Sequence, residues 1–297
     1  MIGSFMHTTI VMMTPILLAA LGGLFTDLSG MLNIGLEGMM LMSAFVSVYV
    51  ANATGSLLIG VLAGVVSASL LAAIMAVFSL NLKANVFVVG LATNLMAAGM
   101  TVFLSGWLVG TRGTIVFHEA PRLSRIDVPL LGDIPVIGRM LTGYSVMDFL
   151  AIGLTVACFF VIFKTSYGYH LRSVGRDYKT AESVGISIYR HRFAAFIISG
   201  VFAGLGGAAL SLPLRAFVGG MTGGRGWIAL VAVVLGRGNP FGVLIASLIF
   251  GAASAVSNTL QAVTDIPPKL LLAVPFVVTL VAMIIHAVRR HDSLEQQ

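Results

Sequence analysis

Long apolar runs separated by short polar segments make up most of this chain. A helix needs about 20 residues to cross the hydrocarbon of a bilayer. Single runs of about that length lie at residues 1–27, 86–108, 145–163, 193–212, 241–263 and 270–288. Residues 38–82 carry no charge and have room for two further helices, with a turn at 51–56. The pattern predicts an all-α polytopic membrane protein with about eight or nine transmembrane helices.

Residues 26–43 differ from the apolar runs around them. They carry Asp27, Asn33 and Glu37, with glycines at 30, 35 and 38. An ionisable group at membrane depth costs roughly 2.5–3.5 kcal/mol, and glycine weakens a helix by about 1 kcal/mol relative to alanine. We therefore expect a helix break, a close helix contact or a polar pathway here. Asp27 is expected to cap the first helix, and on a continuous helix Asn33 and Glu37 would share a face.

A second irregular segment lies in the other half of the chain. Only eleven residues separate Arg225 from Arg237, too few for an ordinary span. Residues 227–235 are therefore expected to form a half-helix or a re-entrant element packed inside protein. Just before it, Gly200 and Gly204 form a small-xxx-small pair, as do Ala203 and Gly207, which lets helix backbones approach closely. Such glycine-interrupted segments in both halves are compatible with an inverted repeat.

Two longer polar segments predict the orientation of the chain. Residues 109–143 contain three prolines, balanced charges and short β-like runs, which are typical of a folded extramembrane loop. Residues 164–192 carry six Lys and Arg against two acidic side chains, which predicts a cytoplasmic segment. The single span at 145–163 then places 109–143 on the outer face. Two arginines at 289 and 290 mark a cytoplasmic C-terminus, and counting back puts the N-terminus outside.

Composition supports a membrane protein and narrows its function. Of the 297 residues, 58% are hydrophobic and only 9% charged, with a mean hydropathy of +1.02, whereas soluble domains have about 25% charged residues. The net charge of +6 does not indicate nucleic-acid binding, because the basic residues are confined to segments between apolar runs. The first nine residues contain no Lys or Arg, so the first run is expected to be a spanning helix and not a signal peptide. We interpret residues 1–297 as one transmembrane domain.

Motifs for catalysis or nucleotide binding are missing from the sequence. It contains no G-x-x-x-x-G-K-[ST] phosphate loop, no H-E-x-x-H, and no G-x-S-x-G elbow with plausible partners. The single Cys158 lies in an apolar run and is expected to be a buried packing residue, and no metal site is expected. A transport role follows. A passive channel is an open alternative, and an intramembrane enzyme would need more closely clustered polar side chains.

The basic segment contains a candidate contact for another protein. Residues 177–183 are helix-like, and Gly185 follows as a stop signal. A short amphipathic helix at the cytoplasmic face would suit a soluble partner. The alternative is a solvated loop that only sets the membrane orientation.

Residues 174–188, V-G-R-D-Y-K-T-A-E-S-V-G-I-S-I, resemble the coupling segment of ABC-importer permeases of the branched-chain amino acid and simple sugar superfamily. Two further blocks of that family follow in the same order, at 198–208 and 227–242. The motif L-N-I-G-L-E-G-M-M-L at 32–41 is similar to the subgroup for nucleoside and purine-type uptake, whereas the sugar subgroup usually has G-G-I-D-L-S-V-G there. One departure is Asp177-Tyr178-Lys179, where many members have Asn-Pro.

The resemblance implies an ABC-importer permease fold and transport by alternating access in a bacterial plasma (inner) membrane. It implies that this chain holds no cofactor, because ATP and Mg²⁺ bind to a separate cytoplasmic ABC ATPase. It also implies a second homologous permease subunit and an extracytoplasmic solute-binding protein. A simple-sugar (pentose-type) importer is the alternative. The residues implied to couple to the ATPase are Gly175, Arg176, Ala181, Glu182, Ser183, Gly185 and Ile186.

Five residues are candidates for the substrate pathway, namely Asn33, Glu37, Asn94, Phe217 and Trp227. The polar three either bind a polar substrate or brace the helix break. The two aromatic side chains either stack on a nucleobase, a contact that contributes about 1–3 kcal/mol, or lie at the membrane interface.

Overall fold

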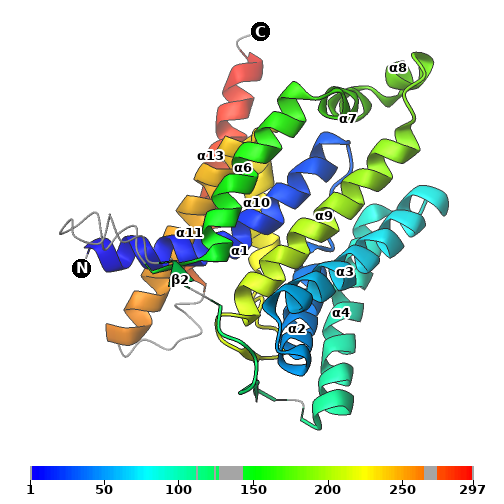
Figure 1. The fold of residues 1–297 in the computed structure, drawn as a ribbon. Helices are drawn as coiled ribbons and strands as arrows, with labels where there is room; N and C mark the ends of the chain where they lie inside the picture. The colour runs from blue at the N-terminus through cyan, green and yellow to red at the C-terminus, as the bar shows by residue number, and fades with distance from the viewer. Residues whose placement is uncertain (1, 112, 124, 127–142, 264–272, 296–297) are drawn as a thin grey trace.

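The computed structural model describes residues 2–111, 113–123, 125–126, 143–263 and 273–295. Within these ranges, seven helices are long and apolar enough to cross a membrane, and two shorter apolar helices accompany them. The long helices are α1 (Ile2–Leu28), α2 (Leu36–Thr54), α3 (Leu57–Ala76), α4 (Val86–Val109), α6 (Val146–Lys164), α9 (Ile188–Ser211) and α11 (Pro240–Val263). The shorter apolar ones are α10 (Arg225–Gly236) and the first part of α13 (Val274–Glu295). The predicted all-α polytopic architecture is confirmed (Figure 1).

Helix α1 forms the centre of the bundle, and α4 lies at its periphery. The side chains of Ile16, Leu17, Leu21 and Leu24 are completely buried where α1 packs against α9, α10 and α11. The membrane-spanning part of α4, in contrast, buries only a narrow face that includes Thr93 and lies against α2. Cys158 is buried, as predicted.

The glycines of α9 bring three helix backbones together. A Cβ on Gly200 would lie 2.7 Å from the Cβ of Ala72, and one on Gly204 would lie 2.7 Å from the Cα of Val65, both on α3. A Cβ on Gly207 would collide with the carbonyl oxygen of Met40 on α2. Ala203, between them, is fully buried. The close approach predicted from the small-residue spacing is confirmed.

The predicted helix break lies at residues 29–35, between the end of α1 and the start of α2. Two expectations about it are wrong. Asn33 precedes α2 and Glu37 lies in its first turn, so the two do not share the face of one continuous helix. The carboxylate of Asp27, which lies in the last turn of α1, has no hydrogen-bond partner among the described residues. A carboxylate cannot donate to the free carbonyls of a helix end, and the Ser29 hydroxyl donates to the carbonyl of Thr26 instead.

Helix α10, with 12 residues, is the short element predicted for 227–235. Gly224 and Arg237, which flank it, both adopt left-handed backbone conformations. The helix packs against α1, α2, α11 and α13. It therefore lies inside the protein, as a helix too short to span must do.

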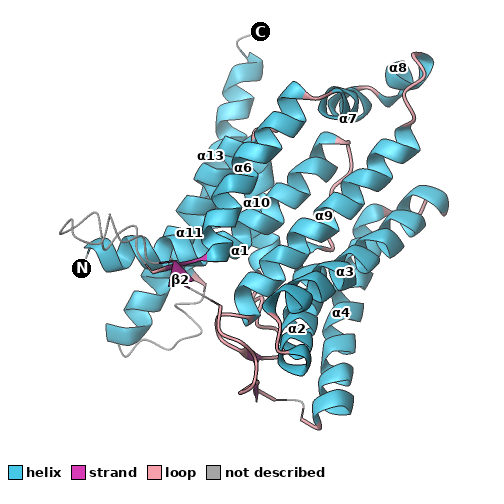
Figure 2. Cartoon of the chain, viewed as in Figure 1, coloured by secondary structure: helices cyan, strands magenta, loops and turns pink. Residues whose placement is uncertain are grey.

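The polar segments lie at opposite ends of the bundle. Strand β1 (Ile115–Val116) pairs antiparallel with β4 (Ala216–Phe217), and β2 (Arg125–Ile126) pairs with β3 (Tyr144–Ser145) (Figure 2). The short β-like runs predicted in 109–143 are thus present, while residues 127–142 and the turn at 264–269 lie outside the described residues. Helices α7 (Ser166–Arg176) and α8 (Tyr178–Ser183) lie at the other end of the bundle, as does the C-terminal end of α13 (Figure 1).

Candidate functional site

Glu37 holds the N-terminus of α10. Its Oε1 accepts a hydrogen bond from the backbone N–H of Gly224 at 2.8 Å, and its Oε2 accepts one from the N–H of Gly226 at 2.7 Å. The first N–H groups of a helix have no partner within the helix, and that end carries partial positive charge. A Cβ on Gly226 would lie 2.5 Å from the Cα of Glu37, so α2 and α10 touch through backbone. The carboxylate therefore joins the helix break to the half-helix.

Arg225 lies beside this junction. Its guanidinium donates to the carbonyl oxygens of Met221 at 3.2 Å and Thr222 at 3.1 Å, which closes the turn before α10. Gly224 and Gly226 flank Arg225 and both donate to Glu37, so an arginine and a carboxylate lie at the same junction.

Two asparagines satisfy the backbone groups that the break leaves free. Asn33 is fully buried, accepts the N–H of Gly35 at 3.0 Å and donates to the Ser199 hydroxyl on α9 at 2.8 Å. Asn94 on α4 accepts the N–H of Gly38 at 2.8 Å and donates to the carbonyl of Ile34 at 2.9 Å. Broken backbone within a membrane protein needs such partners, because lipid offers none.

The two aromatic candidates lie in different surroundings. Trp227 is 39% exposed in the first turn of α10, directly after Gly226. Phe217 is 1% exposed in β4, where its ring packs edge-on against Phe45 at a centroid distance of 5.1 Å. The structure thus brings Asn33, Glu37, Asn94 and Trp227 around the start of α2, and it places Phe217 in the packed core beside the β1–β4 pair.

Side-chain caps position α7 and α8 at the end of the bundle. The Thr165 hydroxyl accepts the N–H of Gly168 at the start of α7. Asp177 caps α8 by accepting the N–H groups of Lys179 and Thr180 at 3.0 and 3.2 Å and the Thr180 hydroxyl at 2.5 Å. The bonds from Thr180, then that from Lys179, lower the pKa of Asp177. Aspartate and asparagine are equally good caps, so the departure from Asn-Pro preserves the start of this helix.

The residues predicted to couple to an ATPase divide into an outer and an inner set. Arg176, Glu182, Ser183 and Gly185 are exposed. Ala181 is buried, and Gly175 and Ile186 are partly buried. A cavity of about 230 Å³ between α7 and α8 is lined in part by Arg176, Ala181 and Ile186. The segment therefore has an exposed surface and a buried or partly buried inner side.

That inner side touches the helix break directly. A Cβ on Gly175 would overlap the carbonyl oxygen of Leu28 and lie 2.9 Å from the backbone nitrogen of Gly30. Arg192, in the second turn of α9, donates from Nε to the carbonyl of Ser29 at 3.2 Å. A continuous series of contacts thus runs from α7 through residues 28–35 to Glu37 and α10. Sequence reasoning did not single out Arg192, Ser199 or the partners of Glu37, because no local spacing records contacts between distant segments.

The chain is similar to known membrane transport proteins over most of its length. Residues 5–283 match the family described as the branched-chain amino acid transport system permease component. The chain belongs to this family. It is 35% identical to the guanosine ABC transporter permease protein NupQ of Bacillus subtilis, over 93% of this chain and 89% of the relative. It is 34% identical to the nucleoside ABC transporter permease protein NupC of Lactococcus lactis, over 91% and 88%.

A more distant relative is a putative glucose ABC transporter permease protein of Haloferax volcanii, 30% identical over 87% of this chain and 78% of the relative. The predicted family is thereby confirmed, and the chain is a multi-pass permease subunit of an ABC transporter, not an enzyme. Membership in an ABC permease family implies partners that hydrolyse ATP and bind solute.

Proposed function

We propose that this chain is a permease subunit of an ATP-driven importer for nucleosides or purine-like solutes. The observation that carries the proposal is the similarity, over most of the chain, to two permeases named for guanosine and nucleosides. The motif at residues 32–41 supports it, because this motif forms the break around which Asn33, Glu37 and Asn94 meet. A simple-sugar importer is the second candidate, favoured by the relative named for glucose.

In this proposal the substrate moves along the partly exposed side of the α2–α10 junction. Glu37 and Asn94 are partly exposed there, and the Trp227 ring follows at the start of α10. A nucleobase stacking on this ring would gain about 1–3 kcal/mol. Asn33 braces the break from within. Phe217 would reach the substrate only in a conformation in which the β1–β4 end of the bundle has opened.

The exposed surface of α7 and α8 would dock the cytoplasmic ATPase, which binds ATP and Mg²⁺. Glu182, Ser183 and Gly185 would contact the ATPase. A movement of α7 and α8 would then reach residues 28–30 through the backbone contact at Gly175. Alternating access requires that the outward and inward states differ in their affinity for ligands. A shift of residues 28–35 would move Glu37 and α10 together, because hydrogen bonds join them. This shift would change the affinity for substrate between the two states.

The complete importer would contain further subunits in a bacterial plasma membrane. Two guanosine permease proteins of Bacillus subtilis resemble this chain, at 35% and 25% identity, which supports pairing with a homologous but unlike permease. With α7 and α8 on the cytoplasmic side, the C-terminal end of α13 would also be cytoplasmic, and the end of the bundle that carries β1 and β4 would face an extracytoplasmic solute-binding protein (Figure 1).

Uptake into proteoliposomes tests the proposed substrate. The complex is reconstituted with its partner subunits and binding protein, and uptake of labelled guanosine is measured with ATP on the ATPase side. We expect uptake against a gradient, and competition by other nucleosides but not by pentoses. Competition by pentoses alone would favour the sugar importer. Guanosine equilibration without ATP would indicate a passive channel.

Two tryptophans provide a matched pair of variants for the pathway. Trp227→Ala is expected to raise the guanosine concentration for half-maximal uptake by about tenfold, the loss of one stacking contact. Trp107→Ala removes a tryptophan that is 72% exposed on α4 and should leave uptake unchanged. Equal effects of the two substitutions on guanosine uptake would show that Trp227 does not contact the substrate.

A further inference from the structure

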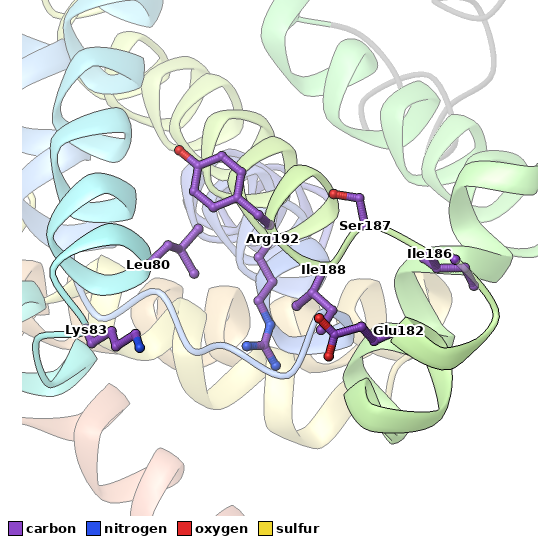
Figure 3. A pocket seen from close by; sticks show the side chains of 9 residues that line it. Leu80, Lys83, Glu182, Ile186, Ser187, Ile188 and Arg192 are labelled. Carbon is purple, nitrogen blue, oxygen red and sulfur yellow. The ribbon is translucent and has the colours of Figure 1, made fainter.

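A cavity of about 620 Å³ lies between the end of α3, the start of α9 and helix α8 (Figure 3). Two stretches of the chain line it, residues 80–83 and residues 182–192. Its lining includes Leu80, Lys83, Glu182, Ile188, Tyr189 and Arg192. Apolar and charged side chains therefore line the same cavity. None of the residues that form the α2–α10 junction is among them.

Charged groups in this cavity have hydrogen-bonding capacity to spare. Within the described part of the chain, the Lys83 ammonium and the Glu182 carboxylate have neither a hydrogen bond nor an ion pair. Arg192 uses Nε for the carbonyl of Ser29, and its terminal amino groups have no acceptor among the described residues. Figure 3 shows Lys83 and Glu182 reaching toward Arg192 from opposite sides. The cavity has two cations against one anion, a net charge of +1.

Lys83 is held in place by an unusual turn. After α3 the chain continues as a π-helical turn, Val77–Asn81, and the N–H groups of Leu82 and Ala84 then donate to the carbonyls of Val77 and Phe78. Lys83 itself has a φ of +52°, in the left-handed region that non-glycine residues seldom adopt. Such conformations persist where the surrounding structure enforces them, often at ligand sites.

The ends of two membrane spans place the cavity at the level of lipid headgroups. The span Leu57–Asn81 ends two residues before Lys83, and the span Ile188–Ser211 begins at the cavity wall. Tyr189 is 46% exposed there, as aromatic residues at a membrane interface commonly are. Leu82 is 64% exposed beside Lys83, which leaves apolar surface next to the charges.

We propose that this cavity binds the headgroup of an anionic phospholipid. Lys83 and the terminal amino groups of Arg192 hold the phosphodiester, because charge-assisted hydrogen bonds to phosphate are strong and arginine presents a planar fork. The acyl chains lie along Leu80 and Leu82, and Glu182 at the rim of the cavity stays available for the ATPase contact proposed above. Basic pockets between spans at the basic side of a membrane protein suit such lipids. Since Arg192 also bonds Ser29, the bound lipid steadies the helix break.

Lipid binding to the purified permease complex in neutral detergent tests this site. Short-chain phosphatidylglycerol and phosphatidylcholine are titrated separately, and bound lipid is counted by native mass spectrometry. We expect phosphatidylglycerol to be retained preferentially and not to be displaced by millimolar inorganic phosphate or glycerol 3-phosphate. Equal retention of both lipids would overturn the proposal. Displacement by the soluble phosphates would overturn the lipid as occupant and indicate a site for soluble phosphate compounds.

Two exposed lysines at span ends supply the variant and its control. Lys83→Glu is expected to weaken phosphatidylglycerol binding by at least about fivefold, the effect of losing one basic residue near anionic lipid. Lys164→Glu, at the end of α6 and outside the cavity, should leave binding unchanged. Equal affinity of the wild type and Lys83→Glu, with both complexes intact by size-exclusion chromatography, would contradict the assignment.

Discussion

Gly175 and Leu28 touch through their backbones, so that a Cβ on Gly175 would overlap the Leu28 carbonyl oxygen. This contact joins α7 to the end of α1 without any intervening side chain. We expect Gly175→Ala to separate the two helices and to reduce substrate-stimulated ATP hydrolysis of the complex, while basal hydrolysis continues. Overpacking of this kind typically costs about 1–3 kcal/mol of stability.

A second glycine controls for the effect of an added methyl group. Gly153 lies in α6, and a Cβ there would meet nothing within 4 Å. Gly153→Ala should therefore preserve both stability and stimulated ATP hydrolysis. If Gly175→Ala also retained full stimulation, the contact between Gly175 and residues 28–30 would not transmit movement of α7 and α8 to the helix break.

Glu37→Gln is expected to loosen α10. A carboxylate accepts both N–H groups, whereas an amide offers one acceptor oxygen and turns its NH₂ toward the other donor. One backbone N–H is then unpaired, at a cost of about 1–3 kcal/mol. The midpoint of thermal unfolding of the permease should fall, whereas Glu119→Gln on an exposed loop should not change it. Equal midpoints for wild type and Glu37→Gln would disprove the structural role of the carboxylate.

Asn33 and Ser199 should be energetically coupled across the bundle. The buried amide of Asn33 donates to the Ser199 hydroxyl. In a double-mutant cycle of Asn33→Ala and Ser199→Ala, measured by unfolding of the permease, we expect a coupling free energy of about 0.5–1.5 kcal/mol. Strictly additive effects would show that the hydrogen bond does not hold the break to α9.

The cap of α8 should be insensitive to pH in the physiological range. Hydrogen bonds from Thr180 and Lys179 lower the pKa of Asp177 below its ordinary value of 3.8. A lowered pKa means that the contribution of the cap is fully present above pH 3.8 and is lost only as the pH falls through the folded-state pKa. Amide exchange in α8 should therefore show equal protection at about pH 5 and pH 8.

Asp177→Ala should remove that protection at both pH values, and Asp177→Asn should largely retain it, because asparagine also caps helices well. Equal exchange in wild type and Asp177→Ala would show that the side chain does not determine the start of α8.

Local signals in the sequence predicted much of the helical fold. Gly185 adopts the positive φ expected of a stop signal, and α8 lies within the helix-like stretch predicted at 177–183. The turn predicted at 51–56 is present but narrower, because α2 continues to Thr54 and ends at Gly55. The helix break was predicted because polar residues and glycines together oppose a continuous apolar helix.

The contacts of the candidate site were not predictable in the same way. Glu37 and Gly226, whose backbone N–H donates to it, are 189 residues apart, and Asn33 and Ser199 are 166 residues apart. Their pairing depends on how α2, α9 and α10 pack in three dimensions. For the same reason the sequence could not distinguish Phe217, which is buried against Phe45, from the exposed Trp227.

If α8 couples an ATPase to nucleoside transport, the stimulation of ATP hydrolysis by nucleosides must depend on α8. Hydrolysis by the reconstituted complex with its binding protein is compared for wild type and Glu182→Lys, with and without nucleoside. We predict that nucleosides stimulate the wild-type complex and that Glu182→Lys abolishes this stimulation, while both complexes remain folded. Full stimulation of the Glu182→Lys complex would show that α8 does not couple hydrolysis to transport, and no response of the wild type to any nucleoside would contradict a nucleoside importer.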